Sequence, residues 1–293
     1  MEGDFGWIQM PSEAEAIMAL QPFSTFADTP IAHAEQEIPK AVSGWEISKK
    51  VLGKYLPPQN QKSAGTCVSF GTACAIHMTW LYNIAKNNGS ASEFKMLSTE
   101  YIYGISRVEV GGKRIGCRSD GSVGGWACEG VKKFGTLFRE KYDKFDLTSY
   151  SMDLSREWGC VGVPDMLEPL GQRHKITGFT KISNSQDAKK AIANGCFLTV
   201  CSNIGFNKTR SNEGVATPGP RWGHCMACVS YKDDLFGIQN SWDQYFAGGK
   251  GDLPDDSCFY VTSKVLDKML EQNDSYAIDN YDGFKPQTVD WLI

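Results

Sequence analysis

The chain has 293 residues, of which 30 are Lys or Arg and 34 are Asp or Glu, so its formal net charge is −4. Hydrophobic residues make up 41% and aromatic residues 12%, which is enough for a packed core and excludes a disordered chain. The mild, evenly spread acidity argues against nucleic-acid binding through bulk electrostatics, and no apolar run approaches the roughly 18–20 residues that span a bilayer.

Residues 1–42 have mixed polarity and contain Pro11, Pro22, Pro30 and Pro39, so we expect an arm or short leader segment there rather than a domain. The N-terminal residues are acidic where those of a secretory leader would be basic, so we expect that the chain is not secreted through a signal peptide. We therefore expect a cytoplasmic location, or one inside a particle assembled in the cytoplasm, where the ten cysteines are mostly thiols.

The clearest helical pattern begins at residue 66 or 67, where apolar residues recur at the i, i+3, i+4, i+7 spacing of a core-facing stripe. This helix is expected to end at the Asn-Asn-Gly tripeptide of residues 87–89, because these residues tolerate the left-handed conformation. Further helices are predicted over 125–134 and 185–194, each followed by a glycine.

Three segments in the second half of the chain, 196–202, 224–231 and 235–242, are rich in β-forming residues and predict short strands. The first half is thus mainly helical and the second half mainly strand. This pattern predicts a helical lobe over roughly 43–170 and a β-rich lobe over roughly 171–293, with a cleft between them where a site would lie.

A cysteine nucleophile needs a base, and the chain contains four histidines. His33 lies in the arm, and His174 lies in a polar stretch without an orienting partner nearby. His77 lies on the same helix as Cys67 but ten residues further on, which is about 15 Å along the axis at ~1.5 Å per residue. His224, which opens a predicted strand, is therefore the favoured base for Cys67.

Cys67 suits nucleophilic chemistry if it stands in the first turn of its helix, because the free N–H groups and the dipole there stabilise a thiolate. A neighbouring imidazolium would lower the pKa of the thiol further and then deliver a proton to the leaving group. Cys74 falls deep in the apolar stripe of the same helix, so we expect it to be an inert core thiol.

Asn240 is the candidate third member of the site. An antiparallel hairpin centred on Lys232 places Asn240 opposite His224, provided that the turn has an odd number of residues. A two-residue turn would send the two side chains to opposite faces, and the turn sequence allows either. If the two are paired, the Asn240 carbonyl accepts a hydrogen bond from the imidazole and selects its tautomer.

Five short segments follow one another along the chain and carry a family resemblance: NQKSAGTC at 60–67, LSTE at 97–100, SVGGW at 122–126, GH at 223–224 and QNSW at 239–242. In this order and approximate spacing, from about residue 43 to about 270, they resemble the papain-like cysteine proteases. The resemblance implies a papain-like two-lobed α+β fold, with a mainly helical lobe, a β-barrel-like lobe and the active site in the cleft between them.

The resemblance also implies a cysteine peptidase that hydrolyses protein or peptide substrates through an acyl-enzyme intermediate, without a cofactor. Cys67 would be the nucleophile, His224 the base and then the acid, and Asn240 the orienting residue. Gln61 would supply a side-chain N–H to the oxyanion hole, beside the backbone N–H of Cys67.

Three further residues take roles only through the resemblance. Gly124 and Gly125 would line the non-primed substrate cleft with bare backbone, and Trp242 would shield the hydrogen bond between His224 and Asn240 from water. The sequence departs from the family pattern at residue 68, which is Val instead of an aromatic residue, and at residue 243, which is Asp instead of Gly. These departures concern the shape of the cleft and the substrate preference.

The remaining cysteines are expected to be structural. The family's common disulfide would join the positions of Ala64 and Ser122, where both half-cystines are absent, and we expect free thiols at Cys117 and Cys160. The CxxC pattern of 225–228 looks like half a zinc site, but residues three apart on a strand point to opposite faces, so we expect no metal there.

Two alternative functions remain open. The chain could be a papain-fold structural or interaction subunit of a larger assembly, such as a virus particle, with the arm as its contact to an assembly partner. It could instead be an amidase, isopeptidase or acyltransferase with the same three residues. The arm is shorter than the family's usual inhibitory propeptide, which argues against control of the site by that route.

Overall fold

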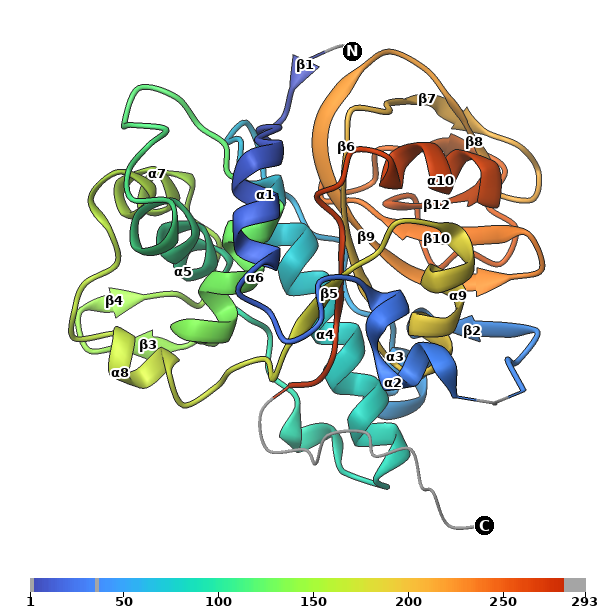
Figure 1. Cartoon of the computed structure of the whole chain (residues 1–293), viewed down its shortest axis with the longest axis horizontal. Helices are drawn as coiled ribbons and strands as arrows, with labels where there is room; N and C mark the ends of the chain where they lie inside the picture. The colour runs from blue at the N-terminus through green and yellow to red at the C-terminus, as the bar shows by residue number, and fades with distance from the viewer. Residues whose placement is uncertain (1–2, 35–36, 282–293) are drawn as a thin grey trace.

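The computed structural model describes residues 3–34 and 37–281. The longest described helix, α4 (Cys67–Lys86), separates a group of helices from a group of strands (Figure 1). Side chains of this helix enter two hydrophobic cores, because Val68 and Ile76 pack in the core of the helical lobe whereas Met78 packs in that of the β-rich lobe. The predicted α+β fold with a helical lobe and a β-rich lobe is therefore confirmed.

The helical lobe contains the helices that follow α4 and one short hairpin. Its elements are α5 (Thr99–Gly104), α6 (Gly124–Lys133), β3 (Lys141–Tyr142), β4 (Phe145–Asp146), α7 (Met152–Val161) and α8 (Glu168–Gly171). The predicted helices at 66/67–86 and 125–134 correspond to α4 and α6. The predicted stop is also found, because α4 ends before Asn87 and Asn88 has a φ of 53°.

The β-rich lobe is built on an eight-stranded sheet, in which six strands follow the order β12-β10-β9-β6-β13-β5 while β1 and β2 also pair with β9. The six are β5 (Phe179–Lys181), β6 (Leu198–Ser202), β9 (Trp222–Lys232), β10 (Leu235–Gln239), β12 (Cys258–Thr262) and β13 (Tyr276–Ile278). A smaller sheet and two helices complete the lobe: β7 (Phe206–Arg210), β8 (Ala216–Pro218), β11 (Ala247–Gly248), α9 (Ser185–Ala193) and α10 (Ser263–Leu270).

The hairpin of β9 and β10 has a two-residue turn, and not the odd-numbered turn that would place Asn240 opposite His224. Lys232 pairs with Leu235 across a two-residue turn, a register that by itself would send the side chains of residues 224 and 240 to opposite faces. A β-bulge at Val229 then shifts the register by one, so that Cys228 pairs with Ile238. The extra residue restores the parity of the pairing and returns both side chains to one face.

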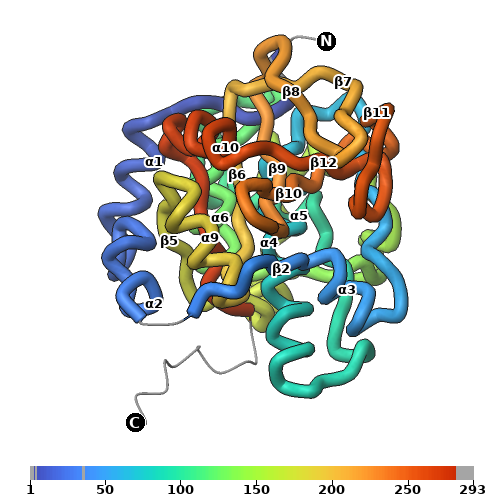
Figure 2. The backbone as a smooth tube through the Cα atoms, turned by 90° about the vertical axis from the view of Figure 1, so that its right-hand side faces the viewer, coloured from blue at the N-terminus to red at the C-terminus, as the bar shows by residue number. Residues whose placement is uncertain are grey.

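The described part of the arm packs against the rest of the chain. Its elements are β1 (Gly3–Asp4), α1 (Pro11–Met18), α2 (Pro30–His33) and β2 (Ala41–Ser43). Both strands pair with β9, while α1 packs on α6 of the helical lobe and α2 packs on α9 of the β-rich lobe. The segment that contains α1 and α2, dark blue in Figures 1 and 2, runs along one face of the molecule, and the arm as a whole contacts both lobes.

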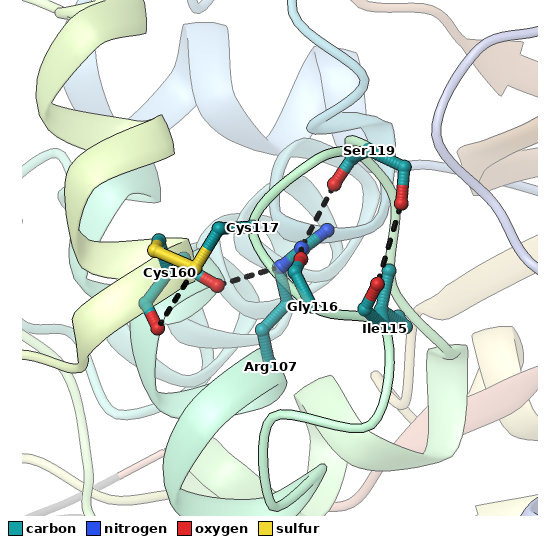
Figure 3. Close-up of a disulfide and its surroundings, with 7 residues drawn as sticks. Arg107, Ile115, Gly116, Cys117, Ser119 and Cys160 are labelled. Carbon is teal, nitrogen blue, oxygen red and sulfur yellow. Dashed lines mark hydrogen bonds between the residues drawn. A yellow bond between two sulfur atoms is a disulfide. The ribbon is translucent and has the colours of Figure 1, made fainter.

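Cys117 and Cys160 form a disulfide, so the expectation of free thiols was wrong for this pair. The bridge joins the loop before α6 to α7, across 43 residues of sequence (Figure 3). The guanidinium of Arg107 brings the two segments together, because it donates to the backbone carbonyl of Gly116 in the loop and to that of Gly159 in α7. The other eight cysteines are free thiols.

No helix in the described ranges 3–34 and 37–281 is both long enough and apolar enough to cross a membrane. Over the same ranges, no cluster of three or more His, Cys, Asp or Glu side chains is arranged to hold a metal ion.

Candidate active site

Cys67 is the first residue of α4 and is fully buried. Its Sγ accepts a hydrogen bond of 3.3 Å from the backbone N–H of Cys225, which brings the start of α4 to the residue that follows His224 on β9. Burial raises the pKa of Cys67 well above its usual value, and the neighbouring Cys225 thiol raises it further. In this state, loss of solvation outweighs the stabilisation that a helix N-terminus offers to a thiolate.

His224 and Asn240 are joined by a hydrogen bond of 2.8 Å between His224 Nε2 and Asn240 Oδ1. Asn240 Oδ1 also accepts from the backbone N–H of Ser241 at 2.7 Å, which holds the amide oxygen in place beside the ring. The other ring nitrogen of His224, Nδ1, is buried and has no hydrogen-bond partner in the part of the chain that the structure describes. The pair therefore leaves one ring nitrogen free.

Burial lowers the pKa of His224 to about 4, and the hydrogen bond to Asn240 opposes this only in part, so the imidazole is neutral near pH 7. In the unfolded chain the pKa is about 6.5, so between pH 6.5 and pH 4 the unfolded state binds more protons than the native state. We therefore expect the free energy of unfolding to fall on acidification through this window, by about 3 kcal/mol from His224 in total.

Urea denaturation at pH 7 and at pH 4.5 measures this loss. A His224→Gln variant is the comparison, because it retains every other titrating group and should show a shallower pH dependence. An equal pH dependence in both proteins would contradict the expected contribution of His224.

Aromatic rings enclose the His224 side chain. Trp242 stacks on the imidazole with ring centroids 4.3 Å apart and an interplanar angle of 28°. Trp222 meets the imidazole edge-on at 6.2 Å, and Phe5 of the arm lies 6.0 Å from it and 4.7 Å from Trp242. His224 is fully buried and Asn240 is 2% exposed, so water competes little for the hydrogen bond between them.

Gln61 is buried, and its side-chain amide has a defined orientation. The Oε1 atom accepts from the hydroxyl of Ser241 at 2.8 Å, while Nε2 donates to the carbonyl of Ala64 and to the carbonyl of Phe5, both at 2.9 Å. One Gln61 N–H thus already binds the backbone carbonyl oxygen of a peptide unit, which is the chemistry that an oxyanion-hole donor needs.

The start of the arm occupies the cleft beside these residues. The backbone N–H groups of Phe5 and Trp7 donate to the carbonyl of Gly223, and Ser122 donates to the carbonyl of Gly6 at 2.8 Å and accepts from Ile8 at 2.9 Å. These arm residues, together with Gln61 and Trp242, line a cavity of about 730 Å³. Although the arm is shorter than the family's usual inhibitory propeptide, its first described residues therefore lie against Gln61 and Trp242.

Gly124 and Gly125 begin α6, and their N–H groups donate to the two carboxylate oxygens of Asp274 at 2.7 and 2.8 Å. Asp274 also accepts from the indole N–H of Trp7 at 2.7 Å and from the hydroxyl of Tyr276 at 2.9 Å. Burial raises the pKa of this carboxyl, and the four hydrogen bonds oppose the shift. The two glycines thus anchor Asp274, while the backbone of the arm pairs with Ser122.

A Gly124→Ala substitution should destabilise the protein by about 1–3 kcal/mol through overpacking. An added Cβ would lie 2.8 Å from the backbone carbonyl oxygen of Asp274 and 2.8 Å from Sγ of Cys201, which ends a short and fully buried side chain. Gly130→Ala in the same helix is the matched control, because its Cβ would lie 3.1 Å from the side chain of Ile105 and no closer than 3.6 Å to the backbone of Ser106. Urea denaturation of both variants tests the difference, and equal stabilities would contradict it.

No role was expected for Asp274, or for Ser241 within the QNSW segment, although both form hydrogen bonds to residues of the candidate site. Asp274 is an isolated acidic residue ahead of β13, and its partners come from the arm and from α6, so only the folded chain brings them together. For Phe5 and Trp7 a signal existed, because two aromatic residues flank a glycine at the start of an otherwise mixed segment.

No protein-family model and no curated protein sequence matches the chain. Solved structures do match it. Xylellain, a cysteine protease from Xylella fastidiosa, superposes with a TM-score of 0.58 at 18% identity, covering 88% of this chain and 91% of that one. The proform of Amb a 11, a cysteine protease and major ragweed pollen allergen, superposes with a TM-score of 0.53 at 16% identity, covering 91% of this chain and 73% of that one.

The chain has a papain-like fold. Both neighbours are cysteine proteases, and the papain-like architecture extends over both lobes of this chain. Within this fold, Cys67 lies at the start of α4, His224 on β9 and Asn240 directly after β10.

Proposed function

We propose that the chain is a papain-like cysteine peptidase that hydrolyses peptide bonds in a protein or peptide substrate, with Cys67, His224 and Asn240 as its catalytic residues. The observation that carries the proposal is the state of His224: Nε2 binds Asn240, and Nδ1 is left without a partner. The next residue on β9, Cys225, donates its N–H to Sγ of Cys67. A base with a free nitrogen thus stands beside a thiol at a helix N-terminus.

The proposed reaction begins when neutral His224 takes the proton of the Cys67 thiol. The thiolate then attacks the substrate carbonyl, and the charge that develops on the oxygen is stabilised by Gln61 Nε2 and by the first N–H groups of α4, which lack intrahelical partners. The imidazolium returns its proton to the leaving amine, and water hydrolyses the acyl-enzyme with His224 again as base. Asn240 holds the ring and Trp242 shields their hydrogen bond.

The described conformation is a latent one under this proposal. Cys67 and His224 are fully buried, Asn240 is 2% exposed, and the carbonyl of Phe5 occupies the Gln61 N–H that a substrate would need. Release of the arm admits water and substrate, which also removes the burial that now raises the pKa of the thiol and lowers that of the imidazole.

A peptidyl epoxide that alkylates active-site thiols tests the proposal. The Gly6→Ala variant, in which the arm can no longer follow its path through the cleft, should form one adduct, at Cys67, and leave the seven other free cysteines unmodified. Mass spectrometry of the peptides locates the adduct. Its absence, or its spread over several cysteines at the rate seen in urea-denatured protein, would refute an activated Cys67.

The alternative of a structural subunit assigned the arm the role of a contact to an assembly partner. The described part of the arm packs on its own chain, so it supplies no observation in favour of an assembly partner. An amidase, isopeptidase or acyltransferase would use the same residues, and analysis of the products by mass spectrometry separates these reactions from peptide hydrolysis.

A further inference from the structure

A second cavity, of about 350 Å³, lies beside the active-site cleft and shares Ser119 and Asp120 with it. Its remaining wall is formed by Tyr103, Arg107, Cys117, Arg118 and Arg156. Cys117 is solvent-exposed and is bonded to Cys160, which does not line the cavity. The cavity therefore gives access to one sulfur of the disulfide.

Arg107 contributes a buried positive charge to this wall. Its guanidinium donates to the carbonyls of Gly116 and Ser119 (Figure 3). It also donates to the carbonyls of Gly121 and Gly159 and to the hydroxyl of Tyr103, so all five acceptors are uncharged. The side chain is 3% exposed and forms no ion pair with any described residue. Its donors are thus satisfied while its charge is not neutralised by a contacting carboxylate.

The two other arginines add to this charge. Arg156 forms an ion pair of 3.0 Å with Asp120, the one carboxylate in the wall. Arg118 is exposed and has no hydrogen bond or ion pair with any residue that the structure describes. Three guanidinium groups against one carboxylate leave a local excess of two positive charges beside Cys117, which attracts anions at low ionic strength.

We propose that this cavity is a docking site for small anionic thiols, which open the Cys117–Cys160 bridge by thiol–disulfide exchange. The incoming thiolate attacks Sγ of Cys117 and forms a mixed disulfide, while the bond to Cys160 breaks and its electron pair leaves on the Cys160 thiolate, which takes a proton from water. A second thiolate then attacks the sulfur of the first, releasing Cys117 as a thiolate and a disulfide of the two small molecules.

The bridge also fastens the loop that borders the arm. Asp120 in this loop accepts from the backbone N–H of Gly65 at 3.0 Å, and Ser122 at its end pairs with Gly6 and Ile8. Opening the bridge removes the covalent link between this loop and α7. The proposed docking site for thiols therefore lies beside the loop that forms hydrogen bonds with the arm.

Three small thiols of different charge test the proposal on the full-length protein. The thiolates of 2-mercaptoethanesulfonate, 2-mercaptoethanol and cysteamine carry net charges of about −2, −1 and 0 and are otherwise similar in size. Opening of the Cys117–Cys160 bridge is followed by acid quenching, alkylation and mass spectrometry of the peptides. Each rate, per thiolate, is divided by the rate of the same thiol with 2-hydroxyethyl disulfide, which removes differences in intrinsic reactivity.

At low salt we expect the normalised rate to be about tenfold higher for the sulfonate thiol than for cysteamine, and the difference to disappear at about 0.5 M salt. Arg118→Gln should reduce the preference about threefold, whereas Lys50→Gln, an equal change of charge on an exposed residue of α3 (Gly44–Leu52), should leave it unchanged. Normalised rates that are equal for the three thiols would overturn the proposal. So would Arg118→Gln and Lys50→Gln changing the preference for the sulfonate thiol by the same factor. The readout does not depend on peptidase activity.

Discussion

Replacing Cys67 with serine in the Gly6→Ala background is expected to lower kcat/KM for peptide hydrolysis by at least about 10⁴-fold. Serine has a much higher pKa than cysteine, and a neutral imidazole beside it provides too weak a base to generate the alkoxide without further activation. The rest of the site, including Gln61 and the hydrogen bond between His224 and Asn240, stays in place, so the loss reports on the nucleophile alone. Hydrolysis of a fluorogenic peptide, followed to a single turnover, measures it.

Cys74→Ser is the matched control for this substitution. Cys74 lies on the same helix seven residues further on, is a free thiol, and has a pKa that burial raises to about 12, so it is protonated and unreactive. Its replacement should change kcat/KM by less than about twofold. A Cys67→Ser enzyme that retains the parent rate, or a Cys74→Ser enzyme that loses it, would exclude Cys67 as the nucleophile.

Gly6→Ala alone should raise the rate of peptide hydrolysis about 100-fold over that of the unaltered chain. Gly6 has a φ of 120°, which L side chains rarely adopt, and an added Cβ would lie 2.2 Å from the carbonyl oxygen of Gly65. The backbone of the arm must therefore leave its path, with loss of the hydrogen bonds between Phe5 and Gln61 and between Gly6 and Ser122. Two or three such bonds at about 1 kcal/mol each correspond to roughly a 100-fold shift toward the open state.

Gly53→Ala separates this effect from backbone strain in general. Gly53 follows α3 with a φ of 74°, and an added Cβ would meet no atom within 4 Å. This control should lose some stability and keep the low hydrolysis rate of the parent. If the two variants hydrolyse the peptide equally fast, or if Gly6→Ala gains nothing while its epoxide labelling at Cys67 is also unchanged, the arm does not limit access to the site.

Much of the local structure followed from short-range patterns. The i, i+3, i+4, i+7 spacing and the Asn-Asn-Gly stop placed α4 correctly, and the β-rich segments of the second half correspond to β6, β9 and β10. The prediction succeeds here because each helix end or strand depends on residues within a few positions of one another.

The register of β9 and β10 was harder to predict. A turn sequence of Tyr-Lys-Asp-Asp permits both a two-residue and a three-residue turn, and no sequence pattern near Val229 predicts the bulge there. The side chains of His224 and Asn240 meet only because the two-residue turn and the bulge compensate each other. Their contact depends on the packing of the whole sheet, which a local reading of the hairpin does not contain.

By itself, the sequence determined the α+β class, the helix that begins at Cys67, the strands that carry His224 and lead to Asn240, and the resemblance that joins these residues. Only the tertiary structure decided that the arm lies in the cleft, that Asp274 holds the arm's Trp7 and the start of α6, and that Cys117 is bonded to Cys160. These contacts join residues from 43 to 267 positions apart. Long-range contacts of this kind arise from the packing of complete elements, and no spacing along the chain encodes them.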